Sequence, residues 1–437
     1  MARFLIKDAK QKLNQDVLIM GRVINIRKLS AITFLQIQDY TGFIQTVWEK
    51  EVEVKAGLPT EALAKVGDVV EIEGQVRQDE RAKGGCEILG KNLKVIGTSI
   101  EDLPFDLSKK DINLQLSTLL DLRALSLRHP KIQAIFKLYD LLLKNYGLVM
   151  RANGFTEIKT PKILRAASEG GANFFKIKYF EQSAYLAQSP QFYKQIMVGA
   201  FERVFEIGST FRAEPHFTTR HVNEYISLDG EMGFIDNFKD VATMLNKVLV
   251  SVFERIKEEG ADYLSMYNAV DLSVPKEIPS IKLAEIREII KKKYKYEIPE
   301  ITDIDPEGEH LAGRYAKEEF NSDFIFLTHY PWSDRPFYTM PSPDNAEETC
   351  GFDLLFKGME IVTGSQRIHK YDELIANMKK KNIKPDGMEY YLDVFKFAMP
   401  PHGGWGLGSE RLIQQMLGLK SVKEAILFPR DVKRLSP

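Results

Sequence analysis

The sequence predicts an α+β protein in two parts, a small five-stranded β-barrel followed by a large domain built on an antiparallel sheet flanked by helices. Residues 17–97 contain short segments that alternate between apolar and polar side chains and are separated by turns. From residue 132 onward, segments with apolar residues at helical spacing alternate with short apolar strands. A chain of 437 residues is also too long for one ordinary core and fits two domains.

The composition is that of an ordinary globular protein, with 44% hydrophobic and 28% charged residues. The 60 Lys and Arg residues balance 61 Asp and Glu residues, which restricts any RNA contact to a local surface. Cys86 and Cys350 form no CxxC or Cys/His cluster, so no zinc site is expected. No apolar run approaches the roughly 20 residues that span a bilayer. We therefore expect a cytoplasmic protein with no membrane segment.

Five segments account for the predicted barrel: 17–27, 33–39, 43–48, 69–76 and 87–89. Their number and alternation favour a closed barrel of the OB type, which binds nucleic acid on one face. An exposed aromatic ring on such a face can stack on a splayed base, and a nearby amide or guanidinium can contact the base edge. Phe34, Gln45 and Arg27 are the candidates, although an aromatic residue taken alone would more often fill the barrel interior.

The predicted domains follow from these segments. Residues 1–97 form the barrel domain, the polar and turn-rich residues 98–120 form a hinge, and residues 121–437 form the large domain. Residues 132–153 predict an amphipathic helix that ends at Asn153-Gly154. A strand from Phe155 toward Thr160-Pro161 should follow it. Further helical patterns at 236–266 and 281–295 are expected to cover the back of the sheet.

A hairpin with a long loop is predicted at 204–228. The first strand comprises 204–208 and continues through 211–214, and 224–228 returns after a polar turn. Arg212, Glu214, Arg220 and His221 would surround this turn. Two guanidiniums beside a carboxylate suit a polyphosphate, because arginine binds oxygens bidentately. The same residues could instead form surface ion pairs.

A glycine-rich strand at 403–408 runs directly into a helical pattern. Small residues allow a strand and a helix start to approach a ligand closely. A tight turn into a packed helix would explain the glycines. It does not explain Arg411, which lies on the first helical turn.

Residues 350–367 read as a strand, a glycine turn and a second strand. Glu360 and Thr363 lie three residues apart, with Asp353 on the preceding strand, and such oxygens suit Mg²⁺ together with phosphates and water. Arg367 can bind a carboxylate bidentately. A carboxylate-bearing hairpin without metal is the alternative.

Taken with the stretch 186–195, these segments resemble the motifs of class II aminoacyl-tRNA synthetases. The resemblance covers essentially the whole chain and is most specific for the archaeal-type aspartyl branch. Residues 188–194, Gln-Ser-Pro-Gln-Phe-Tyr-Lys, match the aspartyl enzymes, whereas asparaginyl enzymes usually differ here. In this family the helix and strand at 132–161 form a homodimer interface.

The resemblance implies an aspartate–tRNA ligase that uses ATP, Mg²⁺, L-aspartate and tRNA(Asp). It implies catalytic roles for Arg212 and Arg411. It implies ATP contacts by Arg212, Glu214, Arg220, His221, Val222, Tyr225, Glu360, Gly408, Ser409, Glu410 and Arg411. It implies aspartate contacts by Ser168, Glu169, Gln191, Lys194, Arg212, Thr363 and Arg367. Mg²⁺ would bind Glu360, Thr363 and Asp353, and the anticodon would contact Arg27, Phe34 and Gln45.

Specificity for aspartate is expected to follow from charge. Lys194 and Arg367 would present two positive groups in a dry pocket, which neutral asparagine would leave underpaired. Ile24 departs from the larger or polar residue that archaeal-type enzymes often carry on the first strand. This leaves open whether tRNA(Asn) is also charged, in which case a partner amidotransferase would act downstream.

Three alternative functions share parts of this pattern. An asparaginyl-tRNA synthetase has the same fold and ATP site, but the stretch 188–194 argues against it. A non-catalytic RNA-binding paralogue would have no use for the full set of phosphate and metal residues. A tRNA-independent ligase that makes asparagine from aspartyl-adenylate would not need an anticodon-binding barrel.

Overall fold

The computed structural model describes residues 2–49, 64–82, 84–165, 173–215, 217–300 and 302–436. The chain divides into two compact units, Met1–Lys131 and Ile132–Pro437, and each is described by itself. In the described part of the chain, no helix has the length and apolar character needed to cross a membrane.

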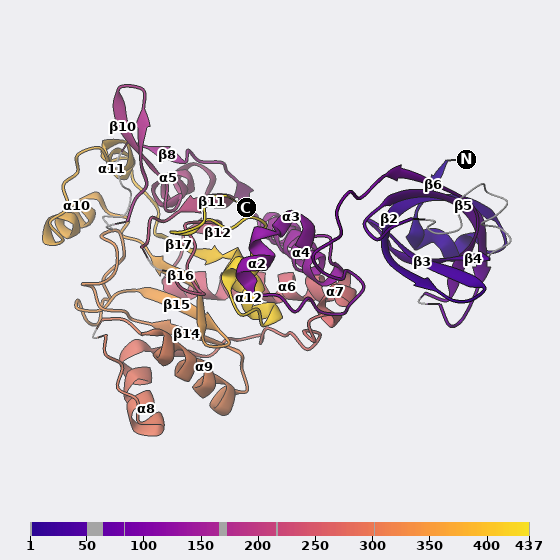
Figure 1. The fold of residues 1–437 in the computed structure, drawn as a ribbon. Helices are drawn as coiled ribbons and strands as arrows, with labels where there is room; N and C mark the ends of the chain where they lie inside the picture. The colour runs from indigo at the N-terminus through magenta and orange to yellow at the C-terminus, as the bar shows by residue number, and fades with distance from the viewer. Residues whose placement is uncertain are drawn as a thin grey trace. The chain divides into compact units, whose positions relative to one another are not determined.

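A closed five-stranded barrel forms the core of the first unit (Figure 1). Its strands are β2 (Asp16–Lys28), β3 (Ile32–Asp39), β4 (Gly42–Glu49), β5 (Val69–Gln78) and β6 (Cys86–Gly97). They follow the order β2–β3–β4–β6–β5, and β5 pairs back with β2. Alternate residues such as Leu35 and Ile37 fill the interior. The predicted five-stranded OB-type barrel is therefore confirmed.

Two features of this unit were not predicted. Strand β6 runs to Gly97, well beyond the predicted 87–89, because it pairs with β5 along its whole length despite its exposed polar residues. A two-residue strand, β1 (Arg3–Phe4), adds in parallel to β2, and a 3₁₀ helix, η1 (Ile6–Lys12), follows it. The short helices α2 (Leu116–Asp121) and α3 (Arg123–Ser126) lie near the end of the unit.

An eight-stranded sheet organises the second unit. Its order is β13–β14–β15–β16–β17–β12–β11–β7. The strands are β7 (Thr156–Glu157), β11 (Arg203–Phe211), β12 (Glu224–Gly233), β13 (Ser280–Lys282), β14 (Phe324–Thr328), β15 (Gly351–Phe356), β16 (Met359–Gln366) and β17 (His402–Gly408). The six central strands are antiparallel as predicted, but both edge strands are parallel to their neighbours, so the sheet is mixed. β11 also ends at Phe211, so residues 212–215 do not continue the strand.

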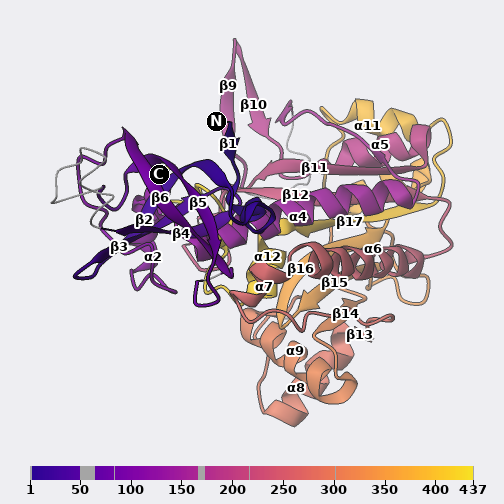
Figure 2. The same cartoon turned by 90° about the vertical axis from the view of Figure 1, so that its right-hand side faces the viewer.

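Helices α4 (Pro130–Ala152), α6 (Phe238–Glu259) and α12 (Ser409–Leu417) contribute with the central strands to one large apolar core. Figure 2 shows α4 and α6 as the two long helices that contribute to this core. Gly154, at φ +81°, directly follows the predicted end of α4. The remaining elements are α5 (Gln191–Phe201), α7 (Ala261–Ser265), α8 (Leu283–Tyr294), α9 (Pro306–Phe320), α10 (Tyr371–Lys380), α11 (Glu389–Phe395), η2 (Val422–Ala425), β8 (Ile163–Leu164), β9 (Lys176–Tyr179) and β10 (Gln182–Leu186).

Helix α9 packs with unusually close backbone contact against the turn between β15 and β16. Lys357 and Gly358 form this turn with positive φ angles of 48° and 74°. A Cβ atom at Gly313 of α9 would lie 2.4 Å from the Gly358 nitrogen. Only glycine at position 313 permits this approach, which fixes α9 against the hairpin that carries Glu360.

We expect Gly313→Ala to destabilise the second unit by about 1–3 kcal/mol, because the new methyl group meets backbone that cannot move aside. Gly199→Ala is the matched control: Gly199 lies on α5, where the nearest atom to an added Cβ is the flexible Met399 sulfur. Denaturant unfolding measures both. An equal or higher free energy of unfolding for Gly313→Ala, as helix propensity alone would give, would refute the steric argument.

Candidate active site

A pocket brings together most of the site residues predicted from sequence. Its walls come from β12, β16, β17, the first turn of α12 and the loop between β11 and β12. The predicted residues that line it are Gln191, Lys194, Arg212, Glu214, Arg220, His221, Val222, Tyr225, Glu360, Thr363, Arg367, Gly408, Glu410 and Arg411. Residues separated by more than 200 positions in the sequence thus converge on one cavity.

Two residues predicted to contact ATP or Mg²⁺ do not line the pocket. Ser409 and Asp353 are buried. Ser168 and Glu169 lie outside the described residues.

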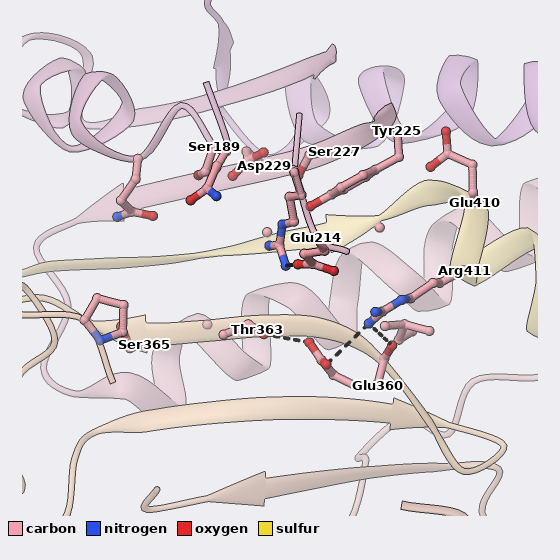
Figure 3. A pocket seen from close by; sticks show the side chains of 18 of the residues that line it. Ser189, Glu214, Tyr225, Ser227, Asp229, Glu360, Thr363, Ser365, Glu410 and Arg411 are labelled. Atoms are coloured by element: carbon pink, nitrogen blue, oxygen red, sulfur yellow. Dashed lines mark hydrogen bonds and ion pairs between the residues drawn. The ribbon is translucent and has the colours of Figure 1, made fainter. Parts of the chain in front are cut away.

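Glu360 is the centre of one side of the pocket. Its Oε1 accepts a hydrogen bond from the Thr363 hydroxyl at 2.8 Å. The Arg411 Nη1 atom lies 3.3 Å from Glu360 Oε2 and 3.1 Å from the Glu360 carbonyl oxygen. Figure 3 shows Glu360 between Thr363 and Arg411, joined to both by dashed lines. This side of the pocket therefore combines a carboxylate, a hydroxyl and a guanidinium.

The loop after β11 contributes a second group of charges. Arg212 Nη1 lies 3.6 Å from Glu214 Oε1, and the Arg212 guanidinium lies 5.6 Å from the centre of the Tyr225 ring. His221 Nε2 lies 3.7 Å from the other oxygen of Glu214. The Asn223 side chain donates to the Arg212 carbonyl oxygen at 2.6 Å and holds the loop in place.

Glu410 is buried beside Arg411. It accepts hydrogen bonds from the backbone N–H of Ile226 and from the Tyr139 hydroxyl, both at 2.9 Å. Burial raises the pKa of Glu410 to about 7, although the hydrogen bond from Ile226 lowers it. These contacts tie the start of α12 to β12 and α4, and thereby fix the position from which Arg411 extends.

The most buried side of the pocket contains two ion pairs in contact with each other. Lys194 Nζ lies 2.8 Å from Asp229 Oδ1 and 3.5 Å from Glu231 Oε2. Arg367 donates from Nε to Glu231 Oε1 at 2.8 Å and from Nη2 to Glu231 Oε2 at 3.2 Å. Burial alone raises the pKa of Glu231, but Arg367 and then Lys194 outweigh it, so the pKa lies below its ordinary value. We define these four side chains as the buried ion network.

The buried ion network adds two carboxylates to the pair of positive groups expected from the sequence. Lys194 and Arg367 are already paired, because a charge in this dry environment needs a partner within the protein. Asp229 and Glu231 were not predicted from the sequence. A signal was available, since carboxylates two residues apart on an apolar strand point to the same face of the sheet.

His402 and Gln195 extend the buried ion network. His402 is fully buried, with Nδ1 2.8 Å from the Pro400 carbonyl oxygen and Nε2 3.2 Å from Gln195 Oε1. Burial lowers the pKa of His402 to about 4, even though Glu231 nearby raises it. The imidazole is therefore neutral near pH 7 and adds no charge to the pocket.

The donor set around Glu360 is compatible with Mg²⁺. Glu360 and Thr363 offer oxygens to the pocket, and Asp353 lies opposite Thr363 on β15 with one oxygen 2.6 Å from Arg335 Nη2. Burial raises the pKa of Asp353, an effect that Arg335 opposes. Within the described ranges no cluster of three or more His, Cys, Asp or Glu residues could hold a metal. The hard-oxygen chemistry fits Mg²⁺ only if phosphates and water complete its coordination.

The barrel places Arg27 and Phe34 opposite each other on β2 and β3. The Arg27 guanidinium lies 4.5 Å from the centre of the Phe34 ring, and Phe34 is half-buried between two buried neighbours. Gln45 on β4 donates to Glu87 at 2.6 Å. Ile24 occupies an irregular position in the pairing of β2 with β3 and is buried.

Comparison with known proteins matches both parts of the chain. Residues 115–432 match the class II tRNA synthetases (D, K and N), and residues 17–103 match the OB-fold nucleic acid binding domain. The chain is 42% identical over 435 residues to the aspartate–tRNA(Asp/Asn) ligase of Thermus thermophilus, with 100% of both chains covered. It is 43% identical over 427 residues to the aspartate–tRNA(Asp) ligase of Thermococcus kodakarensis, covering 97% of this chain and 96% of that protein.

Solved structures agree on the fold. The asparaginyl-tRNA synthetase of Pyrococcus horikoshii complexed with asparaginyl-adenylate superposes with a TM-score of 0.90 at 29% identity, covering 100% of both chains. The chain belongs to the class II tRNA synthetases. Within this class it is a member of the aspartate–tRNA ligases, because it is 42% and 43% identical to the two ligases named above across nearly its full length.

The neutral state of His402 predicts a specific pH dependence of stability. An unfolded imidazole has a pKa near 6.5, so between pH 6.5 and about 4 the unfolded chain binds more protons and stability falls as pH falls. This contribution amounts to at most about 3 kcal/mol. His402→Asn keeps a side-chain donor without the titration. Its free energy of unfolding should decline less steeply than that of the wild type over this range, and parallel curves would contradict the account.

Proposed function

We propose that the chain activates L-aspartate with ATP to aspartyl-adenylate and transfers the aspartyl group to the 3′ end of tRNA(Asp). One observation carries this proposal. One side of a single pocket carries guanidiniums and a hydroxyl–carboxylate pair, which suit a nucleoside triphosphate. The other side carries the buried ion network, which suits a small charged molecule.

The first step joins a carboxylate oxygen of aspartate to the α-phosphorus of ATP and expels pyrophosphate. Such a step needs charge neutralisation and in-line positioning more than proton transfer. Arg212 would contact the α-phosphate and the attacking carboxylate, where negative charge builds in the transition state. In the second step the terminal ribose hydroxyl of tRNA attacks the carbonyl carbon of the adenylate, and AMP leaves.

The nucleotide would occupy the side of the pocket around Glu360. Glu214 would accept from the adenine amine, Arg220 and His221 would contact the polyphosphate, and Arg411 would bind the γ-phosphate. The remaining contacts would come from Val222, Tyr225, Gly408, Ser409 and Glu410. Mg²⁺ held by Glu360 and Thr363, with Asp353 behind them, would neutralise phosphate charge.

The amino acid would occupy the buried side. The contacts of Arg367 to Glu231, Ser365 and Gly404 engage four of its five N–H donors. The remaining donor on Nη1, together with Lys194, would receive the side-chain carboxylate of aspartate. Gln191, Thr363, Ser168 and Glu169 would complete this part of the site. Asparagine would place an amide N–H₂ against these donors and leave them unsatisfied, which gives strong discrimination.

The other partners follow the same proposal. The barrel would bind the anticodon through Arg27, Phe34 and Gln45, with the Phe34 ring as a stacking platform. The enzyme would act in the cytoplasm as a homodimer. If it also charges tRNA(Asn), a downstream amidotransferase would convert the product.

Charging assays with labelled amino acids test the function. We expect labelled aspartate to be attached to a tRNA(Asp) transcript. Aspartate on tRNA(Asn) as well would define a dual-specificity enzyme, and labelled asparagine on tRNA(Asn) would instead support the asparaginyl alternative. No transfer of aspartate to either transcript would refute the proposal.

Arg212→Ala should lower the rate of aspartate-dependent ATP–pyrophosphate exchange by about 10²–10³-fold, because it removes a preformed positive group from the reacting phosphate. The matched control is Arg255→Ala, the same substitution at an exposed position on α6. Near-normal exchange by Arg212→Ala would exclude the role assigned to Arg212.

A further inference from the structure

Helix α9 brings a buried carboxylate to the back of the proposed nucleotide site. Glu309 lies at the end of the first turn of α9 and is 7% exposed. It is not one of the residues that line the pocket, whereas Arg220 and Glu360, which it contacts, both are. The contact between Glu309 and these two residues is not explained by packing alone, because a buried carboxylate is costly without strong partners.

One oxygen of Glu309 connects two parts of the pocket wall. Oε2 accepts a hydrogen bond from the backbone N–H of Glu360 at 2.8 Å. The same atom accepts a hydrogen bond from Arg220 Nη2. The Arg220 and Glu309 side chains are only 16% and 9% exposed, so solvent screens this ion pair weakly. Glu309 therefore joins the loop after β11 to the first residues of β16.

The fold holds Glu309 in place independently of these contacts. Asp305 caps α9 by accepting from the Gly308 N–H at 3.0 Å. At the next turn, Gly313 lies against the backbone of Gly358 in the β15–β16 turn. The helix cannot shift along the hairpin without breaking this approach, so the Glu309 carboxylate is a fixed point to which Arg220 is drawn.

We propose that Glu309 is a positioning residue for ATP: its carboxylate holds the Arg220 guanidinium beside Glu360 before the nucleotide binds. Arginine carries five N–H donors, so the pairing with Glu309 leaves donors for phosphate oxygens. A loop arginine fixed in advance loses less freedom on binding, and this increases affinity. The inference rests on the proposed function, because it takes ATP as the ligand of this side of the pocket.

Glu309→Gln tests the inference, because the amide oxygen can still accept from the Glu360 N–H but has no charge for Arg220. We expect the dissociation constant for MgATP, measured by calorimetric titration, and the KM for ATP in pyrophosphate exchange to rise about tenfold. The KM for aspartate and the melting temperature should not change. Glu307→Gln, the same substitution at an exposed position on α9, is the matched control and should behave as wild type.

A double variant separates positioning from general structural damage. In an Arg220→Ala background, Glu309→Gln should weaken MgATP binding by much less than tenfold, because its effect acts through Arg220. Unchanged or tighter MgATP binding by Glu309→Gln would overturn the inference, as would equal losses for ATP and aspartate with a lower melting temperature. If the wild type binds MgATP but shows no aspartate-dependent exchange, the proposed function fails, and the binding titrations still decide the role of Glu309.

Discussion

The second unit of the chain depends on the pairing of Lys194 with Asp229 and of Arg367 with Glu231. Any one of these ions alone at this depth would cost several kcal/mol, and together they are stable only because each has a charged partner and further hydrogen bonds. The partners come from α5, β12 and the end of β16, and backbone carbonyls of β17 accept from both cations. A change in the register of these strands would separate the charges. The register of the central strands therefore brings the four charges together, and their pairing stabilises that register.

The arginines on the nucleotide side of the pocket differ from the buried ion network in burial and in pairing. Its arginines lie closer to solvent, and each is near a carboxylate of the protein: Arg411 near Glu360, Arg212 near Glu214, and Arg220 near Glu309. Such pairs hold the guanidiniums apart from one another without using all their donors. The buried side therefore presents a small rigid site, held in place by its ion pairs, to a small ligand. The exposed side provides oriented cations for a large, highly charged ligand.

Sequence patterns were sufficient where the signal is local. Alternation located the five strands of the barrel, and glycines followed by Arg411 located the junction of β17 with α12. They were insufficient where the contact depends on tertiary register. Asp229 of β12 meets Lys194 of α5 across 35 residues of sequence, and Glu309 meets Arg220 across 89. A strand was predicted from Phe155 onward, where β7 lies. Strand β13 and the parallel pairing of both edge strands were not predicted, because two- and three-residue strands carry no periodicity of their own.

Central to the proposed function is a pocket in which the remaining donors of two buried, paired cations select a carboxylate side chain. ATP–pyrophosphate exchange, measured separately with aspartate and with asparagine, tests this claim directly, because it isolates the amino acid step from tRNA recognition. We predict a kcat/KM for aspartate at least about 10³-fold above that for asparagine, since the amide would leave buried donors unsatisfied. Comparable values for the two amino acids, or a preference for asparagine, would contradict the account.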